Sequence, residues 1–234
     1  MIRGEKQRVP LWILHRYVRW RLRRMFHAIY LSGPLEELDK ERNYPILFFA
    51  NHQSWWDGFL MQPFFDAFKM EYYIMMEERN LRRFSFFRRV GVFGVDLESA
   101  AGRAASLLYA GRLLRDCPSG RRRALLVYPH GRLVDPVEPW PAFQPGLEKL
   151  CSLNRDGATF PLYLHLRMGR YPLPEVFMQL GKPVDLRKNP TRETLEDRLT
   201  EARDALRVQL IETPEKAQTL ALLPAKRRFR GQTQ

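Results

Sequence analysis

His52 and Asp57 are the two side chains whose types and spacing are best suited to catalysis. A carboxylate on one ring nitrogen of a histidine fixes its tautomer and leaves the other nitrogen free to take a proton. The pair could therefore activate a hydroxyl group that another molecule supplies. The structural alternative is a capped turn, in which Asp57 opens a helix and His52 is an ordinary loop residue.

The surrounding elements must bring this pair to a site. The apolar run Ile46–Ala50 ends abruptly in polar residues, which predicts a buried strand followed by a functional loop. Further strands are expected at residues 72–76, 91–95, 124–128, 159–164 and 176–180, with helices at 58–68, 80–89, 99–115, 147–153 and after Asn189-Pro190. This alternation predicts an α/β fold with a mixed, largely parallel sheet covered by helices. Since sites in open α/β sheets collect at the carboxyl ends of strands, His52, Asp96 and His130 are expected along one edge.

Charge and cysteine content narrow the possible partners. The 234 residues include 39 Lys and Arg against 26 Asp and Glu, and this net charge of +13 favours anionic partners. Nucleic acid is not the expected partner, because no zinc finger, RNP-like motif or recognition-helix signature is present. Cys117 and Cys151 form no CxxC and the five histidines show no metal-ligand spacing, so we expect a reducing cytoplasm and no metal site.

The N-terminal region interleaves aromatic and aliphatic residues with arginines over residues 10–31. Pro10 could open a helix there and Gly33-Pro34 could close it. Such a helix could lie at an anionic membrane surface, or pack on the domain with its arginines in water. No run approaches the roughly 20 apolar residues of a membrane span. We therefore expect a basic amphipathic segment at 1–33, a catalytic domain at 34–213 and a loose basic tail at 214–234.

Four segments, in order, resemble the conserved blocks of the glycerolipid and lysophospholipid acyltransferase family, in particular its 1-acylglycerol-3-phosphate acyltransferase-like members. The residues Asn51–Asp57 match the HxxxxD block, and Gly91–Leu97 looks like the second block. Tyr128–Leu133 is similar to the FPEGTR block, and Phe160–Leu162 to a short apolar-Pro-apolar block. The resemblance spans about residues 45–185 and implies a glycerol-3-phosphate acyltransferase-like fold.

This resemblance also implies a function. It predicts an enzyme of lipid metabolism and phospholipid biosynthesis that moves a fatty acyl group to a hydroxyl of a lysolipid. Acyl-CoA or acyl-carrier protein would be the co-substrate, with no other cofactor. His52 would be the general base and Asp57 would orient it. The enzyme would be peripheral, on the cytoplasmic side of the cell membrane.

The candidate substrate-binding residues lie in the first and third blocks: Asn51, Trp55, Trp56, His130, Gly131 and Arg132. The two tryptophans could wall the pocket or pack as core. The sequence departs from the family where it has Leu97 for an Arg, His130 for a Glu, and Gln144-Pro145 before Gly146. In relatives these positions are associated with the acceptor's glycerol phosphate. Arg132 could replace the lost charge or be a solvated loop residue. The alternative acceptor is a lipid alcohol without phosphate, such as a glycosylated or amino-acid lipid.

Overall fold

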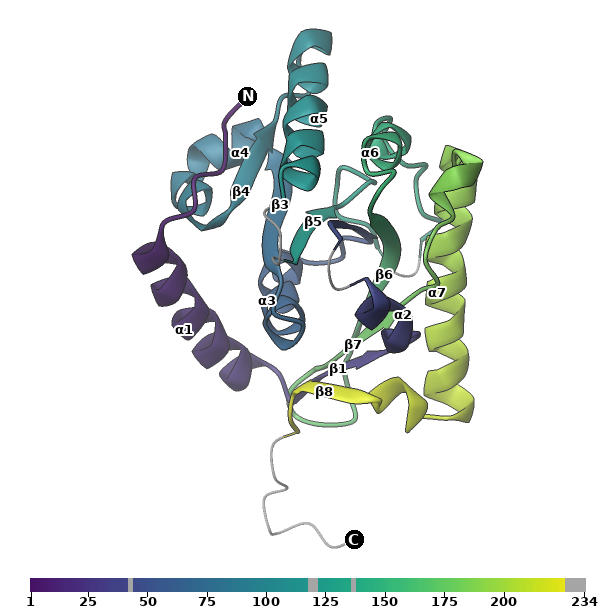
Figure 1. Ribbon diagram of the computed structural model, residues 1–234. Helices are drawn as coiled ribbons and strands as arrows, with labels where there is room; N and C mark the ends of the chain where they lie inside the picture. Colours follow the sequence, from purple (N-terminus) through teal and green to yellow (C-terminus); the bar gives the residue numbers. More distant parts are fainter. Residues whose placement is uncertain (42–43, 118–121, 136–137, 226–234) are drawn as a thin grey trace, which may run out of the picture.

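The computed structural model describes residues 1–41, 44–117, 122–135 and 138–225 (Figure 1). The helices are α1 Arg8–Met25, α2 Leu35–Lys40, α3 Asp57–Ala67, α4 Glu78–Arg83, α5 Ala100–Arg115, α6 Leu147–Leu153 and α7 Arg192–Glu212, with short 3-10 helices η1 Ser85–Val90, η2 Leu186–Lys188 and η3 Lys216–Gln218. The strands are β1 Ala28–Ser32, β2 Ile46–Ala50, β3 Glu71–Glu77, β4 Val92–Val95, β5 Arg123–Val127, β6 Ala158–Arg167, β7 Glu175–Leu180 and β8 Leu220–Leu223.

These strands form one sheet in the order β4-β3-β5-β2-β6-β7-β1-β8. The first five of them run parallel, whereas β7 is antiparallel to β6 and β8 is antiparallel to β1. The prediction of a mixed, largely parallel α/β sheet is confirmed. Because β2, β4 and β5 share one direction, their carboxyl ends lie at the same edge of the sheet.

Helices cover both faces of the sheet, and a hydrophobic core fills each interface (Figure 1). The neighbouring residues Phe48 and Phe49 of β2 point into opposite cores, as the side-chain alternation of a strand requires. The core with Phe48 includes residues of α1 and α3, and the core with Phe49 includes residues of α5, α6 and α7. Strands buried on both faces explain why β2 reads as a continuous apolar run.

The N-terminal region differs from the expected helix over residues 10–31. The helix α1 ends at Met25, and Ala28–Ser32 forms the fully buried strand β1 between β7 and β8. Residues 28–31 read Ala-Ile-Tyr-Leu and pack on both sides, so pairing with β7 outweighs their continuation of the helical pattern. Residues 28–32 therefore belong to the sheet, and Val18 and Leu22 of α1 pack into the hydrophobic core on one of its faces. In the described part of the chain, no helix combines the length and apolarity that crossing a membrane requires.

Three smaller expectations also needed revision. The basic stretch at 80–89 forms two pieces, α4 and η1, separated at Phe84. The long helix α7 does not begin directly after Asn189-Pro190 but at Arg192, and Thr191 caps it by accepting a hydrogen bond from the backbone N–H of Thr194. The chain after Pro214 is not simply a loose tail, because Leu220–Leu223 pairs with β1. The basic residues at 226–230 lie outside the described residues.

Candidate active site

His52 and Asp57 lie in hydrogen-bond contact at the carboxyl end of β2. Nδ1 of His52 is 2.8 Å from Oδ2 of Asp57, so the carboxylate accepts the Nδ1–H of a neutral ring. In that tautomer Nε2 carries the lone pair and can take a proton. The ring also stacks on Tyr128, with 4.3 Å between centroids, which restricts its rotation. The ring is therefore held in one orientation, with Nε2 on the side away from the Asp57 contact.

Asp57 is held by three groups in addition to the imidazole. The backbone N–H groups of Gln53 and Ser54 donate to Oδ2 at 2.6 and 2.9 Å, and the Ser54 hydroxyl donates to Oδ1 at 2.9 Å. Asp57 is also the first residue of α3, where the helix dipole favours a negative charge. The carboxylate is buried, yet these donors replace its lost hydration. Its orientation is therefore fixed before any ligand arrives.

Asn51 positions this loop from beneath. It is fully buried, and its side-chain amide donates to the backbone oxygen of Leu164 at 2.9 Å and accepts from the same residue's N–H at 2.8 Å. Both hydrogen-bonding ends of the side chain are therefore used in joining the end of β2 to β6. Asn51 is not among the residues that line the cavity. Its position suits a structural bridge, although the sequence suggested that it binds substrate.

A cavity of about 430 Å³ opens at this edge of the sheet, and His52 lies in its wall. On one face it extends past Phe59, Ile74 and Phe87 towards Leu14 of α1. On the other face it is bounded by side chains of α5 and α6, among them Leu107, Leu147 and Leu150. Most of the lining is apolar, so the space around His52 suits a molecule with an aliphatic chain.

The two tryptophans of the loop have different surroundings. Trp55 lines the cavity, is half-exposed and lies 5.2 Å from Phe84 between ring centroids. Trp56 packs against Phe59 at 5.5 Å and under the guanidinium group of Arg21, and it does not line the cavity. One tryptophan therefore walls the cavity and the other packs in the core.

The loop after β5 brings Gly131 and Arg132 to the cavity but keeps His130 out of its wall. His130 is buried between Trp140 and Phe143, with centroids at 5.4 and 4.9 Å, and its ring nitrogens have no hydrogen-bond partner among the described residues. Burial, with the nearby Arg132 and His52, lowers the pKa of His130 to about 4, so the ring is neutral near pH 7. Gly131 has a φ of +69°, and a Cβ there would lie 3.0 Å from the Gln144 side chain, so the turn requires glycine.

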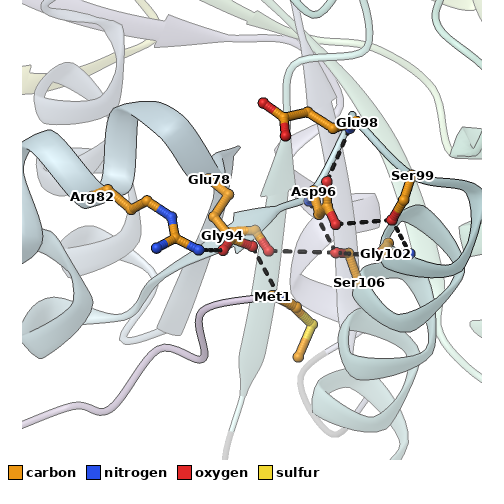
Figure 2. A network of polar contacts seen from close by, with 9 residues as sticks. All are labelled: Met1, Glu78, Arg82, Gly94, Asp96, Glu98, Ser99, Gly102 and Ser106. Atoms are coloured by element: carbon orange, nitrogen blue, oxygen red, sulfur yellow. Dashed lines mark hydrogen bonds and ion pairs between the residues drawn. The ribbon is translucent and has the colours of Figure 1, made fainter.

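Asp96 lies at the predicted edge but belongs to a different network (Figure 2). Its carboxylate accepts hydrogen bonds from the Glu98 N–H at 2.9 Å and the Ser99 hydroxyl at 3.0 Å, and these bonds lower its pKa. The Ser99 hydroxyl in turn caps α5 by accepting from the N–H of Gly102 at 2.9 Å. Asp96 therefore shapes the connection between β4 and α5 and does not line the cavity.

Tyr128 and Arg103 are among the cavity residues that sequence reasoning missed. The ring of Tyr128 supports His52, and burial followed by the charge of Asp57 raises the pKa of its hydroxyl well above the usual value. The place of Tyr128 directly after the β5 run is a signal that could have identified it. Arg103 lies outside the four motif segments, six residues after Leu97, and the packing of α5 beside the cavity brings it there.

With this geometry, Nε2 of His52 can take a proton from a hydroxyl group of a molecule bound in the cavity. Within the described residues, no group of three or more His, Cys, Asp or Glu side chains could hold a metal ion.

The sequence model of the acyltransferase family matches residues 35–158, just over half of the chain, including His52, Asp57 and the loop after β5. A search of curated proteins finds no match.

Proposed function

The chain belongs to the acyltransferase family, the family of glycerolipid acyltransferases, and we propose that it acylates a hydroxyl of a lysolipid with His52 as the general base. Membership of the family supports acyl transfer to a lipid. The observation that carries the finer proposal is the 2.8 Å contact between His52 Nδ1 and Asp57 in the wall of a largely apolar cavity. The proposed donor is acyl-CoA or acyl-carrier protein, and the proposed acceptor resembles 1-acylglycerol-3-phosphate.

In the proposed reaction the acceptor's oxygen attacks the thioester carbonyl carbon while Nε2 of His52 takes the hydroxyl proton. The imidazolium that forms is stabilised by the Asp57 carboxylate at Nδ1. When the tetrahedral intermediate collapses, the carbon–sulfur bond breaks and the proton passes from His52 to the leaving thiolate. No nucleophile from the protein is needed, because the acceptor itself attacks. General-base catalysis of this kind contributes about 10²–10⁴-fold to the rate.

Purified protein with palmitoyl-CoA and a panel of lysolipids tests the proposal, with mass spectrometry to identify the product. Wild-type protein is expected to form a diacyl product, and His52→Ala is expected to lose about 10²–10⁴-fold of that activity. His27→Ala is the matched control, because His27 stacks on Tyr171 and does not line the cavity. Equal acyl transfer by wild type and His52→Ala would remove His52 from the mechanism.

We also propose that α1 places the enzyme on an anionic membrane surface, which is the cytoplasmic leaflet of the cell membrane. The outer face of α1 exposes Trp12 and Trp20, and the guanidinium groups of Arg16 and Arg24 lie over these two rings at 5.3 and 4.4 Å. Rings at headgroup depth and arginines at the phosphates suit an interfacial helix. The inner face of α1 reaches the cavity through Leu14, so a lipid chain would enter close to the membrane.

Sedimentation with phosphatidylglycerol-containing vesicles tests this placement. The double variant Trp12→Ala and Trp20→Ala is expected to bind vesicles at least about tenfold more weakly, because two large apolar side chains no longer enter the interface. Ile211→Ala, which removes an exposed apolar side chain from α7, serves as the control. Unchanged vesicle binding by the double variant would place the membrane contact elsewhere.

A lipid alcohol without a phosphate is the second candidate acceptor. The observation that favours it is Leu97, an apolar side chain that lines the cavity where relatives have an arginine. The buried, neutral His130, where relatives carry an acidic residue, points in the same direction. Direct comparison of lysophosphatidate with a glycosylated or amino-acid lysolipid separates the two acceptors, and efficient turnover of lysophosphatidate would reject the second.

A further inference from the structure

On the face of the sheet that α1 and α3 cover, the cavity forms an apolar arm with two polar side chains in its wall. The apolar lining of this arm consists of Leu14, Phe59, Ile74, Phe87, Val90 and Val92. The polar side chains are Gln62 of α3, which is 3% exposed, and Tyr72 of β3. Gln62 comes five residues after Asp57 in α3, so it lies about 7.5 Å further along the helix axis. An aliphatic chain that starts beside His52 would therefore meet Gln62 part of the way along its length.

The side-chain amide of Gln62 is fixed in one orientation. Its Nε2 donates to the backbone oxygen of His15 at 3.2 Å and to Oδ2 of Asp66 at 3.4 Å. Turning the amide over would place its oxygen against these two acceptors. In the observed orientation Oε1 is buried and has no hydrogen-bond partner among the described residues. Because buried polar atoms are nearly always hydrogen-bonded, a carbonyl of this kind in a cavity wall indicates a ligand that supplies the donor.

The hydroxyl group of Tyr72 uses its own hydrogen within the protein. It lies 3.3 Å from Nε2 of His15, and Nδ1 of the same ring lies 3.6 Å from Oδ1 of Asp66. The carboxylate favours a hydrogen on Nδ1, so Nε2 accepts from Tyr72. Burial lowers the pKa of His15 and raises the pKa of Tyr72, so near pH 7 the imidazole is neutral and the phenol keeps its hydrogen. Gln62 and Tyr72 therefore both offer a ligand in this arm an acceptor, and neither offers a donor.

We propose that this arm binds a fatty chain that carries a hydroxyl group within its length, and that this hydroxyl donates a hydrogen bond to Oε1 of Gln62. A plain hydrocarbon chain would leave Oε1 buried against methylene groups, and a keto group would bring a second acceptor against it. A hydroxyl supplies the donor that the protein lacks there. The chain belongs to the acyl donor or to the lysolipid, since both are aliphatic. The inference rests on the proposed acyl transfer and names the kind of chain that it uses.

Steady-state kinetics with matched chains tests the inference. One set of substrates compares stearoyl-CoA with its mid-chain hydroxy and keto isomers, and a second set carries the same chains on the lysolipid, with palmitoyl-CoA as donor. For one hydroxylated isomer we expect kcat/KM to be about five- to tenfold higher than for the plain and keto chains, because one buried hydrogen bond is gained. The set that shows this preference identifies the substrate whose chain occupies the arm. The absence of a preference in both sets overturns the inference, and so does an equal preference for a keto chain.

Three variants assign the preference to the acceptor atoms. Gln62→Leu removes the carbonyl, so the preference for the hydroxylated chain should disappear while kcat/KM for the plain chain stays within about twofold. Tyr72→Phe removes the second acceptor and should reduce the preference about twofold. Gln209→Leu is the matched control, because Oε1 of Gln209 is also buried without a partner in the described structure but lies on α7, outside the cavity. A preference that survives in Gln62→Leu, or is lost in Gln209→Leu, overturns the inference.

Displacement of a fluorescent fatty acid by stearate and by the hydroxystearate isomers gives a readout independent of catalysis, because neither thioester nor lysolipid is present. Wild type is expected to bind one hydroxystearate about five- to tenfold more tightly than stearate, and Gln62→Leu is expected to bind the two equally. Equal binding by wild type overturns the hydroxyl site. A preference that depends on Gln62 in a protein that transfers no acyl group would leave the site intact and reject the proposed function, so the two failures are distinguishable.

Discussion

The loops after β2 and β5 leave neighbouring parallel strands and meet at the same edge of the sheet, yet they are built in opposite ways. In the loop after β2, the buried carboxylate of Asp57 accepts hydrogen bonds from two backbone N–H groups, a hydroxyl and an imidazole. In the loop after β5, the buried ring of His130 has no hydrogen-bond partner in the described structure, and Arg132 has no ion-pair partner there.

This difference indicates separate tasks. A general base must keep one orientation through the reaction, and a fully bonded carboxylate provides that orientation without help from a ligand. A loop that recognises a substrate needs donors left over for that substrate, and an arginine without a carboxylate partner provides them. We therefore propose that the first loop transfers the proton and that the second recognises the acceptor.

Replacing the carboxylate of the first loop should have the largest effect on catalysis of the changes below. An asparagine at position 57 can still accept from the N–H groups of Gln53 and Ser54, but it cannot stabilise an imidazolium. For Asp57→Asn we expect kcat to fall about tenfold to a hundredfold, with a nearly unchanged unfolding midpoint. Acyl-transfer assays and thermal unfolding measure the two quantities. Wild-type kcat in this variant would show that the ordered network is not catalytic.

Removing the support beneath the first loop should cost stability. For Asn51→Leu, the backbone N–H and oxygen of Leu164 lose their buried partner, so we expect the free energy of unfolding to fall by about 2–4 kcal/mol. Urea denaturation measures the change. Ser152→Ala, which removes an exposed hydrogen bond from α6, is the control and should be nearly neutral. An equally small effect of Asn51→Leu would contradict the proposed role of the Asn51 side chain in joining this loop to β6.

His130 in the second loop should make the stability of the protein depend on pH. The pKa of His130 is lowered from 6.5 to about 4 in the folded protein. Between these two pH values, His130 is therefore protonated in the unfolded chain but neutral in the folded protein. Stability contributed by the neutral ring is therefore lost as pH falls from about 6.5 towards 4. Between pH 7 and 5, wild type should lose about 2 kcal/mol more than His130→Phe, which packs against the same rings without titrating. If urea denaturation shows the same change in the free energy of unfolding with pH for wild type and His130→Phe, then His130 is not the source of the pH dependence.

How far the sequence predicted the site depended on the distance between interacting residues. His52 and Asp57 are five residues apart, and one short segment contains the strand end, the base and the helix start that hold them. Local pattern was enough there, and the parallel strands of the sheet also followed from apolar runs. Trp55 and Trp56 could not be separated in advance, because both occur in the same motif and only packing decides which one faces the cavity.

Residues placed by tertiary packing were harder to predict. The sequence pattern predicts a helix through β1, because the burial of this strand depends on β7, more than 140 residues away in the sequence. Arg103 reaches the cavity because α5 packs beside the loop after β5, and no local signal marks that approach. The sequence therefore identified the contact between His52 and Asp57 but not this arginine in the cavity wall.

Intact-mass measurement of the protein mixed with acyl-CoA in the absence of acceptor tests most directly whether His52 acts as a base on the acceptor. If His52 is a base, no acyl adduct should form on the protein, and the lipid product should form once a lysolipid is added. An acyl group that accumulates on His52 and then passes to the lysolipid would contradict it, since His52 would then be a nucleophile.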